Sequence, residues 1–288
     1  MGLTLPRLKQ EWESLSAVFR EDILERLTIC HLFDDGIVGF PNPPPTRMVE
    51  FIIKTVERER GHVTSQRPIR SAEAIFDILR VLLIHWIRRS GPLKANDFGR
   101  ETGFSYPTLA AALNELEPHL KRHSDRRFEL RSFPRDAWFR LVAKTDKVRH
   151  RQAYVDRSGR PRPIEALLGR LRELKREDIA VGGVLGARHY LPGLDLIGTP
   201  RLDLVLHSPG KGASTEFLRK LDPALKPAER GELPQVVVHT LFRPLSYFTP
   251  GDGLPWADEV ECLLDLHDMR LEQQALEFLD HLQSKAMP

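Results

Sequence analysis

A regular alternation of helix patterns and helix breaks in residues 71–133 constrains the fold more than any other feature of this chain. An apolar stripe with helical spacing runs from Ile75 to Ile87, and Ser71 is a suitable residue to begin that helix. The dipeptide Gly91-Pro92 ends it, because proline cannot donate a backbone hydrogen bond and fixes φ. The region therefore opens with a helix whose apolar face must be covered by the next elements of the chain.

Two shorter helices and a pair of strands are predicted next. Lys94–Thr102 forms the second helix, and Gly103 suits the left-handed position that commonly follows a helix. Ser105 begins a third helix, whose apolar residues are spaced to face inward. The runs Leu120–His123 and Arg127–Phe133 have the character of short strands joined by a polar turn.

The order helix, short helix, turn, helix, hairpin is typical of the winged helix-turn-helix layout. In such a domain the first residues of the third helix meet base edges, and the hairpin reaches phosphates or a neighbouring groove. Arginine suits both roles because its guanidinium binds phosphate or guanine in a bidentate manner. We expect DNA contacts from the third helix, from the hairpin and from residues flanking the second helix: Ser105, Tyr106, Thr108 and Asn114; Arg122, Arg126 and Arg127; Arg88, Arg89 and Lys94.

Charge is distributed unevenly along the chain. Residues 119–163 contain 14 Lys/Arg and five Asp/Glu, a local net charge of +9, whereas residues 256–283 have a net charge of −7. Concentrated positive charge favours a polyanionic partner, although a basic stretch can also be a solvated face and a winged helix can bind protein instead. The third-helix pattern and the basic stretch together favour DNA.

Residues 1–70 are predicted to be a helical N-terminal extension. Apolar residues from Trp12 to Leu27 are close to helical spacing, Pro41–Arg47 is a stiff connector, and Thr46 begins a helix that extends to about Arg60. The N-terminus lacks the apolar run of a signal peptide, and no stretch of the chain is long and apolar enough for a membrane span. With only two cysteines in addition, we expect a cytoplasmic protein.

The chain as a whole is assigned to the α+β class. A winged helix-turn-helix domain over residues 71–145 is followed by a basic, turn-rich linker or arm over residues 146–163. A mixed α/β domain then occupies residues 164–288, with a helix over Ile164–Lys175 and strands over Arg201–Ser208 and Gln235–Phe242. Its last helices, from Trp256 to Gln283, place acidic residues opposite an apolar face.

Enzyme chemistry is only partly represented in the C-terminal domain. Gly182-Gly183 followed by Asp195 and Asp203 is similar to the pattern of nucleotidyltransferases, which need a glycine turn for a triphosphate and an Asp-x-Asp pair for Mg²⁺. Here Val205 stands where the second aspartate is needed. The sequence also contains no P-loop, dinucleotide loop, cysteine cluster or His-Glu-x-x-His motif. We therefore expect no catalytic residues, no metal and no cofactor.

Four segments of the second half carry a resemblance to a known family. They are VGGVLGARHYLPGL (Val181–Leu194), RLDLVLHS (Arg201–Ser208), VVVHTLFRP (Val236–Pro244) and the closing WADEVECLLDLHDMRLEQQALEFLDHL. Together with the winged-helix pattern, they make residues 75–283 resemble the AbiEi-type antitoxins, which join an N-terminal winged helix to a C-terminal antitoxin domain. Residues 1–70 fall outside the resemblance.

The resemblance implies a transcriptional repressor of its own operon. It implies double-stranded operator DNA as the ligand, with cooperative or dimeric binding, and a nucleotidyltransferase-like toxin as a genetic partner that need not form a stable complex with this chain. Two alternatives stay open. One is a nucleotidyltransferase-like enzyme with an accessory winged helix, and the other is an adaptor whose acidic residues 256–283 bind a basic protein.

Overall fold

The computed structural model describes residues 5–33, 36–51, 71–145, 149–195, 201–209, 214–229 and 231–286. The protein is a mixed α+β structure that divides into two compact units, Met1–Ser65 and Gln66–Pro288. Within the described ranges, no helix combines the length and the apolar character that a membrane crossing requires.

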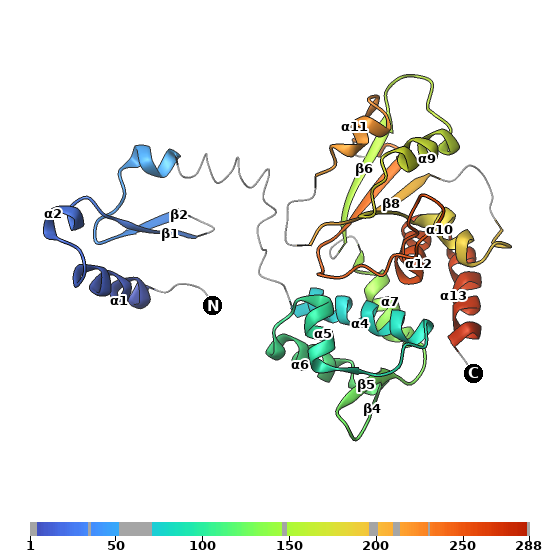
Figure 1. Cartoon of the computed structure of the whole chain (residues 1–288), viewed down its shortest axis with the longest axis horizontal. Coiled ribbons are helices and arrows are strands. Elements are labelled where there is room, and N and C mark those ends of the chain that lie inside the picture. Colours follow the sequence, from blue (N-terminus) through green and yellow to red (C-terminus); the bar gives the residue numbers. More distant parts are fainter. Residues whose placement is uncertain are drawn as a thin grey trace. The chain divides into compact units, whose positions relative to one another are not determined.

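The first unit contains a hairpin that the helical prediction did not include. Its described elements are α1 (Leu5–Ser16), α2 (Glu21–Leu24) and the antiparallel strands β1 (Ile29–Phe33) and β2 (Gly36–Phe40) (Figure 1). β-branched and aromatic residues in both strands favour extended backbone, but the glycines of β2 and the prolines that follow it weaken this signal in the sequence. Residues 46–51 are helical, whereas the rest of the helix predicted to reach Arg60 lies outside the described residues.

The second unit opens with the predicted helices and strands of residues 71–133. These elements are α4 (Ser71–Ile87), β3 (Leu93–Lys94), α5 (Ala95–Thr102), α6 (Tyr106–Glu115), a 3₁₀ turn (Glu117–His119), β4 (Leu120–Arg122) and β5 (Arg127–Leu130). The strands pair antiparallel in the order β3-β5-β4. Gly103 has a φ of 76° after α5, as expected of a left-handed helix end. The helices, with α7 (Arg135–Val142), enclose the fully buried Phe98 and Trp138.

A five-stranded sheet in the order β7-β8-β10-β6-β9 organises the remainder of this unit. β8 and β10 are parallel neighbours and confirm the two predicted strands, while the other pairings are antiparallel. The bounds are β6 (His150–Asp156), β7 (Ile179–Val181), β8 (Leu202–His207), β9 (Leu225–Pro227) and β10 (Val236–Leu241).

Strand β6 corrects the prediction that residues 146–163 are a linker or arm. It lies between β10 and β9, with Tyr154 and Val155 buried. Its basic residues and the turn-forming residues after it concealed the strand pattern in the sequence. Two arginines that follow the strand form ion pairs within the same unit: Arg157 pairs with Glu232 at 2.6 Å, and Arg162 pairs with Asp222 at 2.5 Å.

Helices cover both faces of this sheet (Figure 1). On one face, Leu204 and Val238 belong to a core shared with α9 and α11; on the other, Val205 and Leu241 belong to a core shared with α10, α12 and α13. That second core also includes the buried residues of α4–α7, so the two predicted domains share one core. The helix bounds are α9 (Ile164–Glu173), α10 (Gly183–Tyr190), α11 (Phe217–Leu221), α12 (Glu259–Asp268) and α13 (Glu272–Ala286).

Candidate nucleic-acid interface and a buried polar cluster

Helix α6 exposes its first residues to solvent and buries apolar residues from its second turn onward. Leu109, Ala112 and Leu113 are buried, whereas Tyr106 in the first turn of the helix is 69% exposed. Ser105 precedes the helix in an extended conformation, and its hydroxyl forms a 3.0 Å hydrogen bond with that of Thr108. A hydroxyl pair and an exposed phenol are thus available at the start of the helix.

A groove with a volume of about 750 Å³ lies between α6 and the β4–β5 hairpin. The structure brings five of the ten predicted contact residues together in its lining: Lys94, Tyr106, Asn114, Arg122 and Arg126. The charged side chains around it are five basic ones and two acidic ones: Lys94, Lys121, Arg122, Arg126, Arg131, Glu117 and Asp125. The groove therefore combines an aromatic side chain, an amide and an excess of positive charge.

The arginines of the hairpin differ in how freely they can reach a ligand. Arg126 occupies the turn with a φ of 63° and is exposed. The Arg127 side chain is held by the Asp125 carboxylate, to which its Nε donates at 2.5 Å. The guanidinium of Arg122 lies over the ring of Phe128, 5.5 Å from its centroid. Arg122 and Arg126 are therefore better placed than Arg127 to reach a ligand.

Arg88, one of the predicted phosphate contacts, is engaged within the protein. Its guanidinium donates to the Glu259 carboxylate at 2.8 Å and to the Tyr247 carbonyl at 2.9 Å. Both partners belong to the C-terminal part of the chain, which the sequence could not place beside α4. Arg89 is exposed, but it lines a different cavity, of about 270 Å³, at the end of α4.

A cluster of buried ionisable groups, which the sequence interpretation missed, lies between the sheet and α12. Because strand residues alternate in direction, Asp203 on β8 and His239 on β10 share the sheet face opposite Leu204 and Val238. Asp258, Glu261 and Asp265 follow at i, i+3 and i+7, which places them on one side of α12. This i, i+3, i+7 spacing of acids is the feature of the sequence that could have indicated the cluster before the fold was known.

Arginines from four different segments compensate the acids of this cluster. Arg149 binds both Glu261 and Asp265 at 2.8 Å. Arg201 binds Asp203 at 2.9 Å and Asp268 at 2.5 Å, and Arg243 binds Asp258 at 3.0 Å. Arg80 on α4 lies 3.9 Å from Glu261. Four acids predicted to face solvent (Asp258, Glu259, Glu261 and Asp265) are therefore buried, and each is paired with an arginine of the same unit.

The pKa values of the cluster follow from burial and from the nearest charges. Burial and the negative charge of Asp265 raise the pKa of Asp203 to about 8. Burial alone would also raise the pKa of Glu261, but the charges of Arg149, Arg80 and Arg243 lower it to about 2. Burial lowers the pKa of His239 well below its usual range, and the positive charge of Arg149 lowers it further, so the imidazole is neutral.

The Gly182-Gly183 turn packs directly on this cluster. The backbone N–H of Gly183, at the start of α10, donates to Asp265 Oδ2 at 2.7 Å. Asp203, on the neighbouring strand, accepts from Arg201. In a nucleotidyltransferase the N–H of this glycine turn would bind phosphate, but here it donates to the Asp265 carboxylate of the chain itself. Strand β8 also offers one aspartate, Asp203, rather than a pair.

Substitution of Gly183 by alanine is expected to lower the free energy of unfolding by about 3 kcal/mol, from strain and from overpacking. Gly183 has a φ of 60°, and a Cβ there would lie 2.6 Å from Asp203 Oδ2. Urea unfolding followed by circular dichroism measures the change. Gly159→Ala is the matched control, because Gly159 has a φ of 76° with nothing within 4 Å of a Cβ. Equal losses in both variants would show that the cluster tolerates the added methyl group.

Comparisons with known proteins leave the family unassigned. No protein-family model matches the chain, and no curated protein matches its sequence. The crystal structure of the Megavirus polyadenylate synthase is similar at a TM-score of 0.24 and 10% sequence identity, over 72% of this chain and 42% of that one. The chain thus spans less than half the length of that protein, and a TM-score of this size establishes neither a shared fold nor a shared function.

Proposed function

We propose that this chain is a DNA-binding transcriptional regulator, with residues 71–145 acting as a winged helix-turn-helix module. The observation that carries the proposal is the groove between α6 and the β4–β5 hairpin, where positive charge surrounds the exposed Tyr106. A second support is the element order α4-β3-α5-α6-β4-β5 within residues 71–145, which is the order expected of a domain whose recognition helix and wing bind one duplex.

The two sides of the groove are proposed to have different tasks. The first residues of α6 and the exposed Asn114 contact base edges, since hydroxyl and amide groups can both donate and accept hydrogen bonds there. Arg122 and Arg126 bind phosphates, which position the protein without reading sequence. Lys94 lies at the start of α5 and adds a further phosphate contact.

The biological setting that we propose is an autorepressing antitoxin of a toxin–antitoxin operon. Its support is the resemblance of residues 75–283 to AbiEi-type antitoxins, and its DNA ligand is the operator of the same operon. Of the two alternatives, the adaptor loses much of the acidic surface that it needs, because Asp258, Glu259, Glu261 and Asp265 are buried. The enzyme alternative predicts magnesium-dependent transfer of label from a nucleoside triphosphate, lost in Asp203→Asn.

The DNA proposal is tested by fluorescence anisotropy with the full chain. A duplex from its own upstream region and a scrambled duplex of equal length are titrated from 50 to 200 mM salt. We expect the upstream duplex to bind at least a hundredfold more tightly, because specific sites typically exceed non-specific ones by about 10³ or more. Equal affinity for both duplexes with a steep salt slope would reduce the groove to a non-specific basic surface and contradict a regulator.

A further inference from the structure

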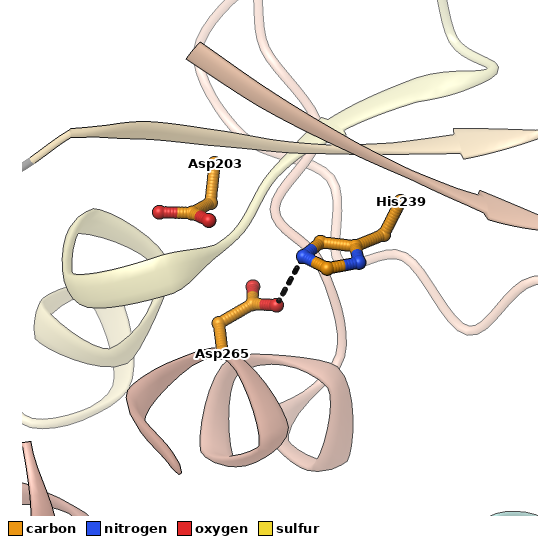
Figure 2. A group of neighbouring side chains, drawn as sticks. All are labelled: Asp203, His239 and Asp265. Atoms are coloured by element: carbon orange, nitrogen blue, oxygen red, sulfur yellow. Dashed lines mark ion pairs between the residues drawn. The ribbon is translucent and has the colours of Figure 1, made fainter. Parts of the chain in front are cut away.

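Three potential metal ligands from three separate elements meet in the buried cluster. Asp203 on β8, His239 on β10 and Asp265 on α12 each offer one donor atom, and these atoms all lie within 4.8 Å of one another (Figure 2). All three residues are buried, with at most 1% of their surface exposed. The arrangement goes beyond the proposed DNA contact, because none of these residues lines the groove.

His239 is one of several described residues of this cluster with buried polar atoms that lack a hydrogen-bond partner; the others are Arg80, Arg149, Arg243 and Glu261. Its imidazole nitrogens, unlike the guanidinium nitrogens, can bind a metal ion. Among the described residues, neither ring nitrogen has a hydrogen-bond partner, although both atoms are buried. Buried polar atoms without partners are rare and cost about 1–3 kcal/mol each. The ring points into the cluster, with Nε2 3.3 Å from Asp265 Oδ1 (Figure 2). A cation bound between these two atoms would give Nε2 the partner that the described residues do not supply.

The separation of His239 from Asp265 and the hydrogen bonds around both carboxylates fit such an ion. Zinc bonds of about 2.0–2.1 Å in a tetrahedron place neighbouring ligand atoms roughly 3.3 Å apart, which is the Nε2–Oδ1 separation observed here. Arg201 donates to Asp203, and Arg149 and the Gly183 N–H donate to Asp265. Metal-binding carboxylates are commonly oriented by hydrogen bonds of this kind, and each oxygen keeps a second lone pair for the ion.

We propose that Asp203, His239 and Asp265 supply three of the four ligands of a buried Zn²⁺ site. One nitrogen and two oxygen donors suit zinc, whereas Mg²⁺ and Ca²⁺ prefer oxygen alone. The ion ties β8 and β10 to α12. Because α12 is in turn linked to α4 through Arg80 and Glu261, the site stabilises the packing that holds the DNA-binding part against the sheet.

Isothermal titration of the full chain, freed of metal by chelation, with ZnCl₂ tests the site. We expect one Zn²⁺ per chain, a higher unfolding temperature with Zn²⁺ than with EDTA, and d–d absorption bands when Co²⁺ replaces Zn²⁺. Asp203→Asn and His239→Gln keep the size of the side chain close to the original and each remove a ligand. Both should weaken Zn²⁺ binding at least tenfold and abolish the thermal shift.

His119→Gln is the matched control, since His119 lies in the 3₁₀ turn before β4, and it should bind Zn²⁺ as the wild type does. Circular dichroism without metal reports whether each variant is folded. If His239→Gln does not fold, the result for Asp203→Asn decides the test. The proposal is overturned if the wild type binds no Zn²⁺, or if folded Asp203→Asn binds it as tightly as the wild type. Either result is independent of DNA binding, which is measured separately.

Discussion

Replacement of Arg149 by methionine is expected to lower the free energy of unfolding by about 3–5 kcal/mol, the range for removing one partner of a buried ion pair. The guanidinium is buried and binds Glu261 and Asp265, each at 2.8 Å. Methionine fills a similar volume but leaves both carboxylates with less compensating charge. Urea unfolding at neutral pH, followed by circular dichroism and tryptophan fluorescence, measures the loss.

Arg157→Met is the control for this prediction. Arg157 forms an equally close pair with Glu232 at 2.6 Å, but its side chain is 44% exposed. Water and salt screen exposed pairs, so the unfolding midpoint of this variant is expected to stay where it is. A midpoint for Arg149→Met equal to that of Arg157→Met would mean that the cluster contributes no more than a surface pair does.

The second large effect is expected at the groove, in the double variant Arg122→Ala with Arg126→Ala. Each phosphate contact that is lost should reduce the slope of log K against log salt by about 0.9, so the pair should reduce it by about 1.8. The loss of affinity should be similar for the upstream and the scrambled duplex, because phosphate contacts carry no sequence information. Tyr106→Ala should instead narrow the difference between the two duplexes.

A charge-matched control separates these contacts from overall charge. Arg160 and Arg172 are exposed in the C-terminal part and do not line the groove. Arg160→Ala with Arg172→Ala removes the same net charge, and we expect it to leave the salt slope close to that of the wild type. If both double variants flatten the slope equally, DNA binding depends on the general charge of the protein rather than on the groove.

The sequence by itself determined the elements whose signals are local. The stripe in Ile75–Ile87, the left-handed Gly103 and the break before Tyr106 each depend on residues within one or two helical turns. The strands β8 and β10 could also be predicted from local sequence, because they are short and largely apolar and are bounded by turn residues. β1, β2 and β6 were missed because glycines, charges and neighbouring prolines weakened the same kind of signal.

Only the tertiary structure decided which charged residues are available to a partner. Arg88 was predicted to contact phosphate and Arg149 lies in the basic residues 119–163. Each instead pairs with an acid of α12, 171 and 116 residues further along the chain. Asp203, His239 and Asp265 likewise meet only because strand alternation and the packing of α12 turn them toward one another. The interaction between two charges depends on their distance in space, and burial strengthens it. The charge of a sequence segment therefore predicts the charge of the protein surface poorly where the fold brings opposite charges together.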